Sequence, residues 1–182
     1  DALILGISGR YEFKNKGIDV FIDAMGQLNR NNGLGKEVLA FILVPAGHAG
    51  ANKELLHNLE LPYQAVTSTD LYLTHYLNDS ANDPVMNRIR AQKLRNSEED
   101  KVKIFFVPSY LNGDDGVLNM PYYDLLVGMD LTAFPSYYEP WGYTPLESLA
   151  FKVPTITTTL AGFGLWVKEH YNMNHPGIEV IH

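Results

Sequence analysis

The run VLAFILV at residues 38–44 is apolar at every position, and it decides the class of fold. A strand of this kind needs cover on both faces, as strands of parallel sheets have. Similar runs predict further strands, and apolar residues at helical spacing, such as Ile18, Phe21 and Ile22, predict helices between most of them. The expected strands are 3–8, 38–44, 102–107, 131–135, 154–159 and 178–181. The expected helices are 18–28, 51–58, 84–95, 121–129, 145–152 and 164–171. This alternation predicts an α/β fold, with a Rossmann-like parallel sheet and helices on both faces.

Length and composition limit the kinds of function. The chain has 182 residues, of which 46% are apolar, and this suits one globular domain over residues 1–182. A net charge of −7 argues against nucleic acid as a partner, and the absence of cysteine excludes disulfides and thiolate metal sites. The six histidines show no metal-ligand spacing. We therefore expect no metal site. No apolar run reaches the roughly 18 residues of a membrane span, so no membrane is expected either.

The ends of the chain carry two expectations. The start, DALILGIS, lacks the basic region and the long apolar region of a signal peptide, so we expect a cytoplasmic protein. The chain also begins and ends in strand-like runs, which predicts that it is a piece of a larger protein.

The loop SGRYEFKNKG, residues 8–17, follows the first expected strand and holds Arg10 and Lys16. Ligands of parallel sheets bind beyond the carboxyl ends of the strands. A guanidinium and an ammonium in a glycine-containing turn at this place suit a diphosphate. The alternative is that both are solvated loop charges. The loop lacks the Gly-Lys-Ser/Thr ending of a P-loop.

The stretch EPWGYTPLE, residues 139–147, follows the fourth expected strand and holds two glutamates. Thr144, Pro145 and Glu147 fit the N-cap, first and third positions of a helix, so we expect a capping box. The free amides of the same helix start suit an anion, and a carboxylate there suits sugar hydroxyls. Glu139 has no such role at the helix start. It lies on a loop at the carboxyl end of a strand, where functional residues concentrate. The alternative is that it is a plain surface carboxylate.

Tyr122 and Tyr123 open the helix before that strand. An aromatic ring at this place suits stacking on a nucleobase, and the alternative is packing on the core. The triplet GFG at 162–164 suits either a close approach of backbone to a ligand or a plain turn. Asp83 and Pro84 fit the N-cap and first position of a helix.

Five segments in this order resemble glycogen synthase of the eukaryotic type, which is glycosyltransferase family three. They are SGRYEFKNKGIDVF, NDSANDPVMNRIR, DKVKIFFVPSYL, FPSYYEPWGYTPLESLA and TTTLAGFG. The resemblance covers about residues 3–171. It implies that the chain is the C-terminal, donor-binding half of a glycosyltransferase with two Rossmann-like domains (the GT-B architecture). The acceptor-side half is not in this sequence, so we expect the chain alone to bind donor weakly and to be inactive.

The resemblance implies transfer of glucose from UDP-glucose to the non-reducing end of an α-1,4-glucan such as glycogen, with retention of configuration and without a metal or other cofactor. Arg10 and Lys16 match the phosphate-contacting pair. Glu139 matches the glutamate near the transferred glucose, and Glu147 the one on the donor, at its ribose. Tyr122 matches the position that stacks on the base. The turn whose amides meet the distal phosphate corresponds to Gly142, Tyr143 and Thr144.

The chain departs from the family in one region. Eukaryotic members carry a longer helical insert after the second strand, and that insert helps to build a homo-oligomer, their tetramer. Here only about residues 48–80 fill the space. Two alternatives to UDP-glucose transfer stay open at this point. One is a starch-synthase-like transferase that uses ADP-glucose, and the other is a non-catalytic module that binds nucleotide sugars.

Overall fold

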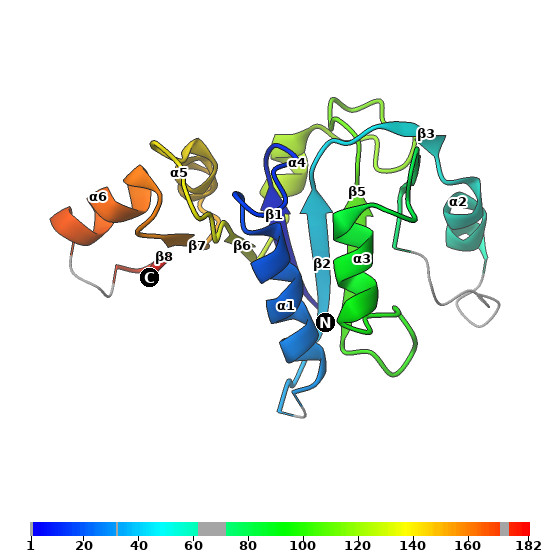
Figure 1. The fold of residues 1–182 in the computed structure, drawn as a ribbon, viewed down its shortest axis with the longest axis horizontal. Coiled ribbons are helices and arrows are strands. Elements are labelled where there is room, and N and C mark those ends of the chain that lie inside the picture. Colours follow the sequence, from blue (N-terminus) through cyan, green and yellow to red (C-terminus); the bar gives the residue numbers. More distant parts are fainter. Residues whose placement is uncertain (1, 32, 62–71, 172–174) are drawn as a thin grey trace.

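A computed structural model describes residues 2–31, 33–61, 72–171 and 175–182 of the chain (Figure 1). Its main feature is a six-stranded sheet in the order β5-β2-β1-β6-β7-β8, with every neighbouring pair parallel. The strands of this sheet are β1 (Ala2–Ser8), β2 (Glu37–Leu43), β5 (Val102–Val107), β6 (Leu131–Ala133), β7 (Thr155–Thr158) and β8 (Ile178–Ile181). The predicted α/β fold with a Rossmann-like parallel sheet is therefore confirmed, and each of the six expected strands is present.

The helices lie between the strands in sequence, as expected, although their ends differ by a few residues from the predicted ones. They are α1 (Ile18–Asn29), α2 (Lys53–Glu60), α3 (Pro84–Ala91), α4 (Tyr122–Leu126), α5 (Tyr143–Ala150) and α6 (Gly162–His170). Gly162 and Gly164 belong to the first turn of α6, so GFG is not a plain turn.

The strand order changes direction at β1. From β1 the chain first builds outward through β2 to β5, and it then returns to place β6, β7 and β8 on the other side of β1. Such a reversal is a topological switch point, and open parallel sheets bind their ligands beside it, beyond the carboxyl ends of the strands. The loops that follow β1 and β6 therefore flank the place where a parallel sheet of this type binds its ligand.

The side chains of β2 point alternately to the two faces of the sheet, and both faces are covered, which explains why its apolar run is continuous. Val38, Ala40 and Ile42 are buried in the main core, which α1 and α3 cover. Phe41 and Leu43 contribute instead to a second cluster, with Leu126 of α4. Because successive side chains of a strand point to opposite faces, both faces of β2 must be apolar. The third cluster packs α6 against β8, through Phe163, Val167 and Ile178.

Two predicted helix starts had opposite outcomes. The prediction for α3 is confirmed, since the Asp83 carboxylate accepts a hydrogen bond from the Met86 amide at 2.9 Å and Pro84 is the first helical residue. The predicted capping box of α5 is wrong. The helix begins two residues earlier than predicted, at Tyr143, and Gly142 precedes it with a φ of 96° and without a side-chain cap. Because the chain enters α5 through this left-handed glycine, Thr144 lies inside the helix and cannot cap it.

A small second sheet was not predicted. It pairs β3 (His48–Ala51) with β4 (His75–Leu77) in antiparallel fashion. Just before β4, the Tyr72 carbonyl accepts a hydrogen bond from the Phe106 amide, and the Thr74 amide donates to the Phe106 carbonyl. The small sheet is thus attached to the outer side of β5, away from the switch point (Figure 1).

Candidate functional site

The loop after β1, residues 9–17, is pressed onto the segment that follows β6. Gly17 ends this loop with a φ of 68°, and a Cβ atom placed on it would lie 2.0 Å from the Pro135 carbonyl oxygen. The Asn15 carbonyl accepts a hydrogen bond of 2.9 Å from the Tyr137 amide. Only glycine permits this backbone conformation together with such a close approach. The two loops at the switch point are therefore held against each other by backbone contacts.

This contact brings two of the predicted site residues together. The Lys16 ammonium forms an ion pair with the Glu139 carboxylate, although 123 residues separate them in sequence. Only 12% of the Lys16 side chain and 20% of the Glu139 side chain are exposed. An ion pair that is mostly shielded from water is stronger than a surface pair, and it leaves a large penalty if one partner is removed.

Glu139 is also fixed through its backbone. Its amide donates to the Leu160 carbonyl at 3.3 Å, and its carbonyl accepts from the Gly162 amide at 3.1 Å. Residues 160–162 connect β7 with α6, so a third strand end of the sheet contributes to the site. Glu139 is thus held by the loops after β1, β6 and β7.

Arg10 does not join this pair. Its guanidinium lies 3.1 Å from Glu12, and 78% of its side chain is exposed. The pKa of Glu12 is lowered, first by a hydrogen bond from the Asn15 amide group and also by the charges of Arg10 and Lys16. The predicted pair of cations therefore has a carboxylate between its members. Sequence reasoning missed Glu12, although its place between Arg10 and Lys16 is visible in the sequence.

The start of α5 lies next to Glu139. A Cβ atom on Gly142 would lie 3.4 Å from Cγ of Glu139. The first amides of a helix have no acceptor within the helix, and the aligned peptide dipoles favour negative charge there. Tyr143 and Thr144 supply two of these amides, whereas Pro145 has none. The predicted anion site at this helix start thus has the Lys16–Glu139 pair as its neighbour.

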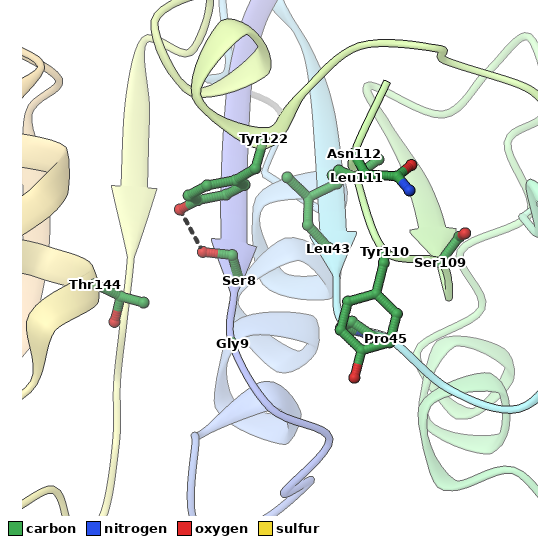
Figure 2. A pocket seen from close by; sticks show the side chains of 10 residues that line it. All are labelled: Ser8, Gly9, Leu43, Pro45, Ser109, Tyr110, Leu111, Asn112, Tyr122 and Thr144. Carbon is green, nitrogen blue, oxygen red and sulfur yellow. Dashed lines mark hydrogen bonds between the residues drawn. The ribbon is translucent and has the colours of Figure 1, made fainter. Parts of the chain in front are cut away.

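A hollow of about 320 Å³ opens beside these loops (Figure 2). Two of the predicted residues, Tyr122 and Thr144, line it from different elements. Gly9 lines it as well, and a Cβ on Gly9 would lie 3.9 Å from the Lys16 side chain, so the hollow adjoins the ion pair. The full lining is Ser8, Gly9, Leu43, Pro45, Ser109, Tyr110, Leu111, Asn112, Tyr122 and Thr144. Mostly apolar walls with a few polar groups are typical of a small-molecule pocket.

Tyr122 contributes both to the core and to the hollow. Its ring packs against the second apolar cluster, and its hydroxyl lies 2.7 Å from the Ser8 hydroxyl, as Figure 2 shows. Burial raises the pKa of the Tyr122 phenol, and the nearby charge of Glu147 raises it further. The Glu147 carboxylate therefore lies near this end of the site. It makes no hydrogen bond with any residue that the structure describes.

The hollow also includes residues that sequence reasoning did not select. Ser109, Tyr110 and Asn112 follow β5, and 77% of Tyr110 is exposed. The signal for these residues was available, since they come directly after a predicted strand at the same sheet edge. Their types alone, a serine, a tyrosine and an asparagine in a loop, did not point to a ligand.

The described part of the chain lacks two other features. It holds no group of three or more histidine, aspartate or glutamate side chains arranged to bind a metal ion. None of its helices combines the length and the apolar character needed to cross a bilayer.

Comparison with known proteins gives a consistent result. The family model described as glycogen synthase matches residues 1–69 and 61–182. Glycogen [starch] synthase isoform 2 of Saccharomyces cerevisiae is 33% identical, over 96% of this chain and 33% of its own length. The liver glycogen [starch] synthase of Rattus norvegicus is 31% identical, over 92% of this chain and 31% of its own length. The Neurospora crassa glycogen [starch] synthase is 33% identical, over 96% of this chain and 32% of its own length.

Two details of these matches concern length. The chain spans about a third of the length of these curated relatives. The alignment with the yeast protein runs over 234 positions, more than the 182 residues of this chain, so the relative carries residues that this chain lacks. The two matched ranges of the family model meet at residues 61–69, inside the region expected to be shorter. With the family model matched along the whole fold, this chain belongs to the glycogen synthase family.

Proposed function

We propose that this chain is the donor-binding half of a retaining glucosyltransferase that moves glucose from UDP-glucose to the non-reducing end of an α-1,4-glucan. A second Rossmann-like domain of a longer protein would face it and bind the acceptor, and the chain alone would be inactive. The relatives that are named glycogen synthases support this reaction class. The proposal includes a cytoplasmic protein, no metal or other cofactor, and a homo-oligomer in the full-length form.

The observation that carries the proposal is the Lys16–Glu139 pair at the switch point of the sheet. Glycosyl transfer from a nucleotide sugar separates charge, since the diphosphate leaves as an anion and the sugar becomes oxocarbenium-like. A shielded ammonium next to a shielded carboxylate offers one group for each of these charges. Preorganised charges in a place with little water stabilise a transition state well.

We assign the leaving group to the cationic side of the site. Lys16 lies on the loop after β1, and the Tyr143 and Thr144 amides lie in the first turn of α5, which follows the loop after β6. Arg10 would join them by exchanging Glu12 for a phosphate oxygen, because a phosphate carries more negative charge than a carboxylate. Together these groups would supply the positive charge that a divalent cation supplies in other transferases.

Glu139 would act on the sugar side. When a diphosphate takes up the Lys16 ammonium, the Glu139 carboxylate is left beside the sugar to be transferred. There it would either stabilise the developing positive charge or hold the glucose hydroxyls, and both roles use the same oxygen atoms. Tyr122 would offer its ring to the nucleobase, with Glu147 near the ribose, because both lie at the end of the site that contains the hollow.

The test is Glu139→Ala in the full-length protein. We expect glucosyl transfer to fall at least about 100-fold, as for the loss of one transition-state contact. UDP binding, measured by calorimetry, should persist, since Lys16 then has no competing partner. Unchanged turnover would refute the role of Glu139. If UDP binding is lost as well, Glu139 serves to build the site and the assignment to the sugar side is wrong.

Two alternatives remain to be separated from this proposal. A ring at Tyr122 suits uracil and adenine alike, so turnover must be compared with UDP-glucose and ADP-glucose. Faster transfer from ADP-glucose would replace the proposed donor. A non-catalytic binding module is the other alternative. The arrangement of Lys16 and Glu139 across two loops speaks against it, and binding without turnover in the full-length protein would support it.

A further inference from the structure

Ser8 is a pocket residue to which neither the sequence analysis nor the proposed mechanism gives a role. It is the last residue of β1, and its hydroxyl lies 2.7 Å from the Tyr122 hydroxyl. Both residues line the hollow beside the ion pair, and Figure 2 shows the bond between them on its inner wall. The bond thus connects the end of the strand at the switch point with the first residue of α4.

The Tyr122 ring has little other support at its polar end. The helix that carries it, α4, has only five residues and no side-chain cap. The base of Tyr122 is held by its amide, which donates to the Leu111 carbonyl at 3.0 Å, and its ring meets Tyr123 at a tilted angle with centroids 5.3 Å apart. The hydroxyl is the far end of the side chain, so its bond to Ser8 restrains the swing of the whole ring.

The protonation state of Tyr122 suits this bond. Burial raises the pKa of its phenol and outweighs the lowering by the Ser8 hydrogen bond, so the phenol holds its proton at neutral pH. A phenol and a serine hydroxyl can each donate or accept. A neutral bond of this kind contributes about 1 kcal/mol, which is enough to favour one ring position about five-fold.

We propose that Ser8 is a positioning residue for the nucleoside end of the donor, because it holds the Tyr122 ring in place as a wall of the hollow. This inference rests on the proposed function, in which Tyr122 meets the nucleobase. A ring that is already in place loses less conformational freedom when a base stacks on it, and binding is tighter for that reason. Ser8 would therefore act on donor binding and leave the chemical step unchanged.

The test compares Ser8→Ala, Tyr122→Phe and the double variant in the full-length protein. Each single change should raise the KM for UDP-glucose about five-fold and leave kcat within about two-fold. The double variant should resemble the single ones, because both changes remove the same bond. Ser8→Thr keeps a hydroxyl and should restore most of the affinity.

The matched control is Ser148→Ala. Ser148 is fully buried, and its hydroxyl accepts a hydrogen bond of 2.9 Å from the Thr132 hydroxyl. This variant therefore also loses one hydrogen bond between two hydroxyls, but at a residue that does not line the hollow. Its KM for UDP-glucose should stay unchanged. An equal rise of KM in Ser148→Ala, or additive effects in the double variant, would overturn the inference.

Calorimetry with UDP and with inorganic diphosphate provides a readout that does not depend on turnover. Ser8→Ala should weaken UDP about five-fold and leave diphosphate unchanged, because diphosphate needs only the cationic side. Equal weakening of both, or of neither, contradicts the inference. A full-length protein that shows this split but transfers no glucose overturns the proposed function alone. A protein that binds no UDP overturns both.

Discussion

Glu139 and Asp100 are both partly buried carboxylates in loops next to the main sheet. Glu139 lies at the carboxyl ends of the strands and Asp100 at the amino ends, and their charges are satisfied in different ways. Asp100 precedes β5 and accepts four hydrogen bonds, from the Asn29 side chain, the Arg95 and Ser97 amides and the Ser97 hydroxyl. Glu139 follows β6, and within the described residues its side chain has one partner, Lys16. The four donors of Asp100 are fixed parts of the fold, whereas the ammonium of Glu139 belongs to a long, flexible side chain.

This difference separates a structural carboxylate from one that is available for chemistry. A carboxylate with several fixed donors cannot change partners without a loss of stability. One that is held by a single ammonium is released when that ammonium turns to an anion of greater charge, such as a diphosphate, and its oxygens can then meet a ligand. The position agrees with this distinction, because parallel sheets bind ligands at the carboxyl edge, where Glu139 lies. Substitutions at the two edges should therefore affect different properties.

Among the substitutions that test this comparison, the largest effect is expected from Lys16→Met in the full-length protein. Turnover with UDP-glucose should fall about 100-fold, since the leaving diphosphate loses its shielded cation. The control is Lys103→Met at the other edge, where the ammonium donates to the Ser97 and Asp100 carbonyls. Its turnover should stay within about two-fold of the unsubstituted protein. Steady-state kinetics would contradict the comparison if both variants lost activity equally.

A second test concerns the contact between the two loops at the carboxyl edge. Gly17→Ala forces a side chain into the left-handed region and against the Pro135 carbonyl, and should lower the free energy of unfolding by about 2 kcal/mol. Gly35→Ala is the matched control, because a Cβ there meets nothing within 4 Å. Urea denaturation measures both. If Gly17→Ala proves as harmless as Gly35→Ala, the loops are not held together by this approach.

The smallest effect is expected from Asp100→Asn, and it depends on pH. Burial opposes ionisation of Asp100, but the hydrogen bonds from Asn29 and Ser97 outweigh it and hold its pKa below the ordinary value of 3.8. Because the folded-state pKa is the lower one, its contribution is present above pH 3.8 and is lost as pH falls through the folded value.

The substitution should therefore cost about 1 kcal/mol at neutral pH and less below pH 3.8, with turnover unchanged. Chemical denaturation at a series of pH values measures this. A loss of stability that is the same at every pH would show that the charge of Asp100 does not matter.

Much of the fold could be predicted because the signals are local. VLAFILV and the other apolar runs gave all six strands of the main sheet, and Asp83-Pro84 gave the start of α3. The small sheet was missed because HAGA and HYL have three or four residues and no apolar alternation. The prediction of a capping box was wrong because Gly142 takes a left-handed conformation, which the amino-acid sequence does not reveal.

The candidate site depends on contacts between distant segments, and these were harder to predict. Position after a strand selected Arg10, Lys16 and Glu139, but the pairing of Lys16 with Glu139 arises from the strand order and from the contact of Gly17 with Pro135. The bond between Ser8 and Tyr122 also joins segments 114 residues apart. Nothing in the local sequence indicates which residues such a sheet order brings together.

The attachment of the small sheet to β5 has a consequence for how this fold can evolve. The small sheet of β3 and β4 is attached to β5, which lies two positions away from β1 in the main sheet (Figure 1). The candidate site begins at the end of β1. Segments of different length can be accommodated beside β5 without a change in the spacing of β1 and β6. Over evolutionary time, the length of this outer region can thus change while the loops that carry Lys16 and Glu139 keep their places.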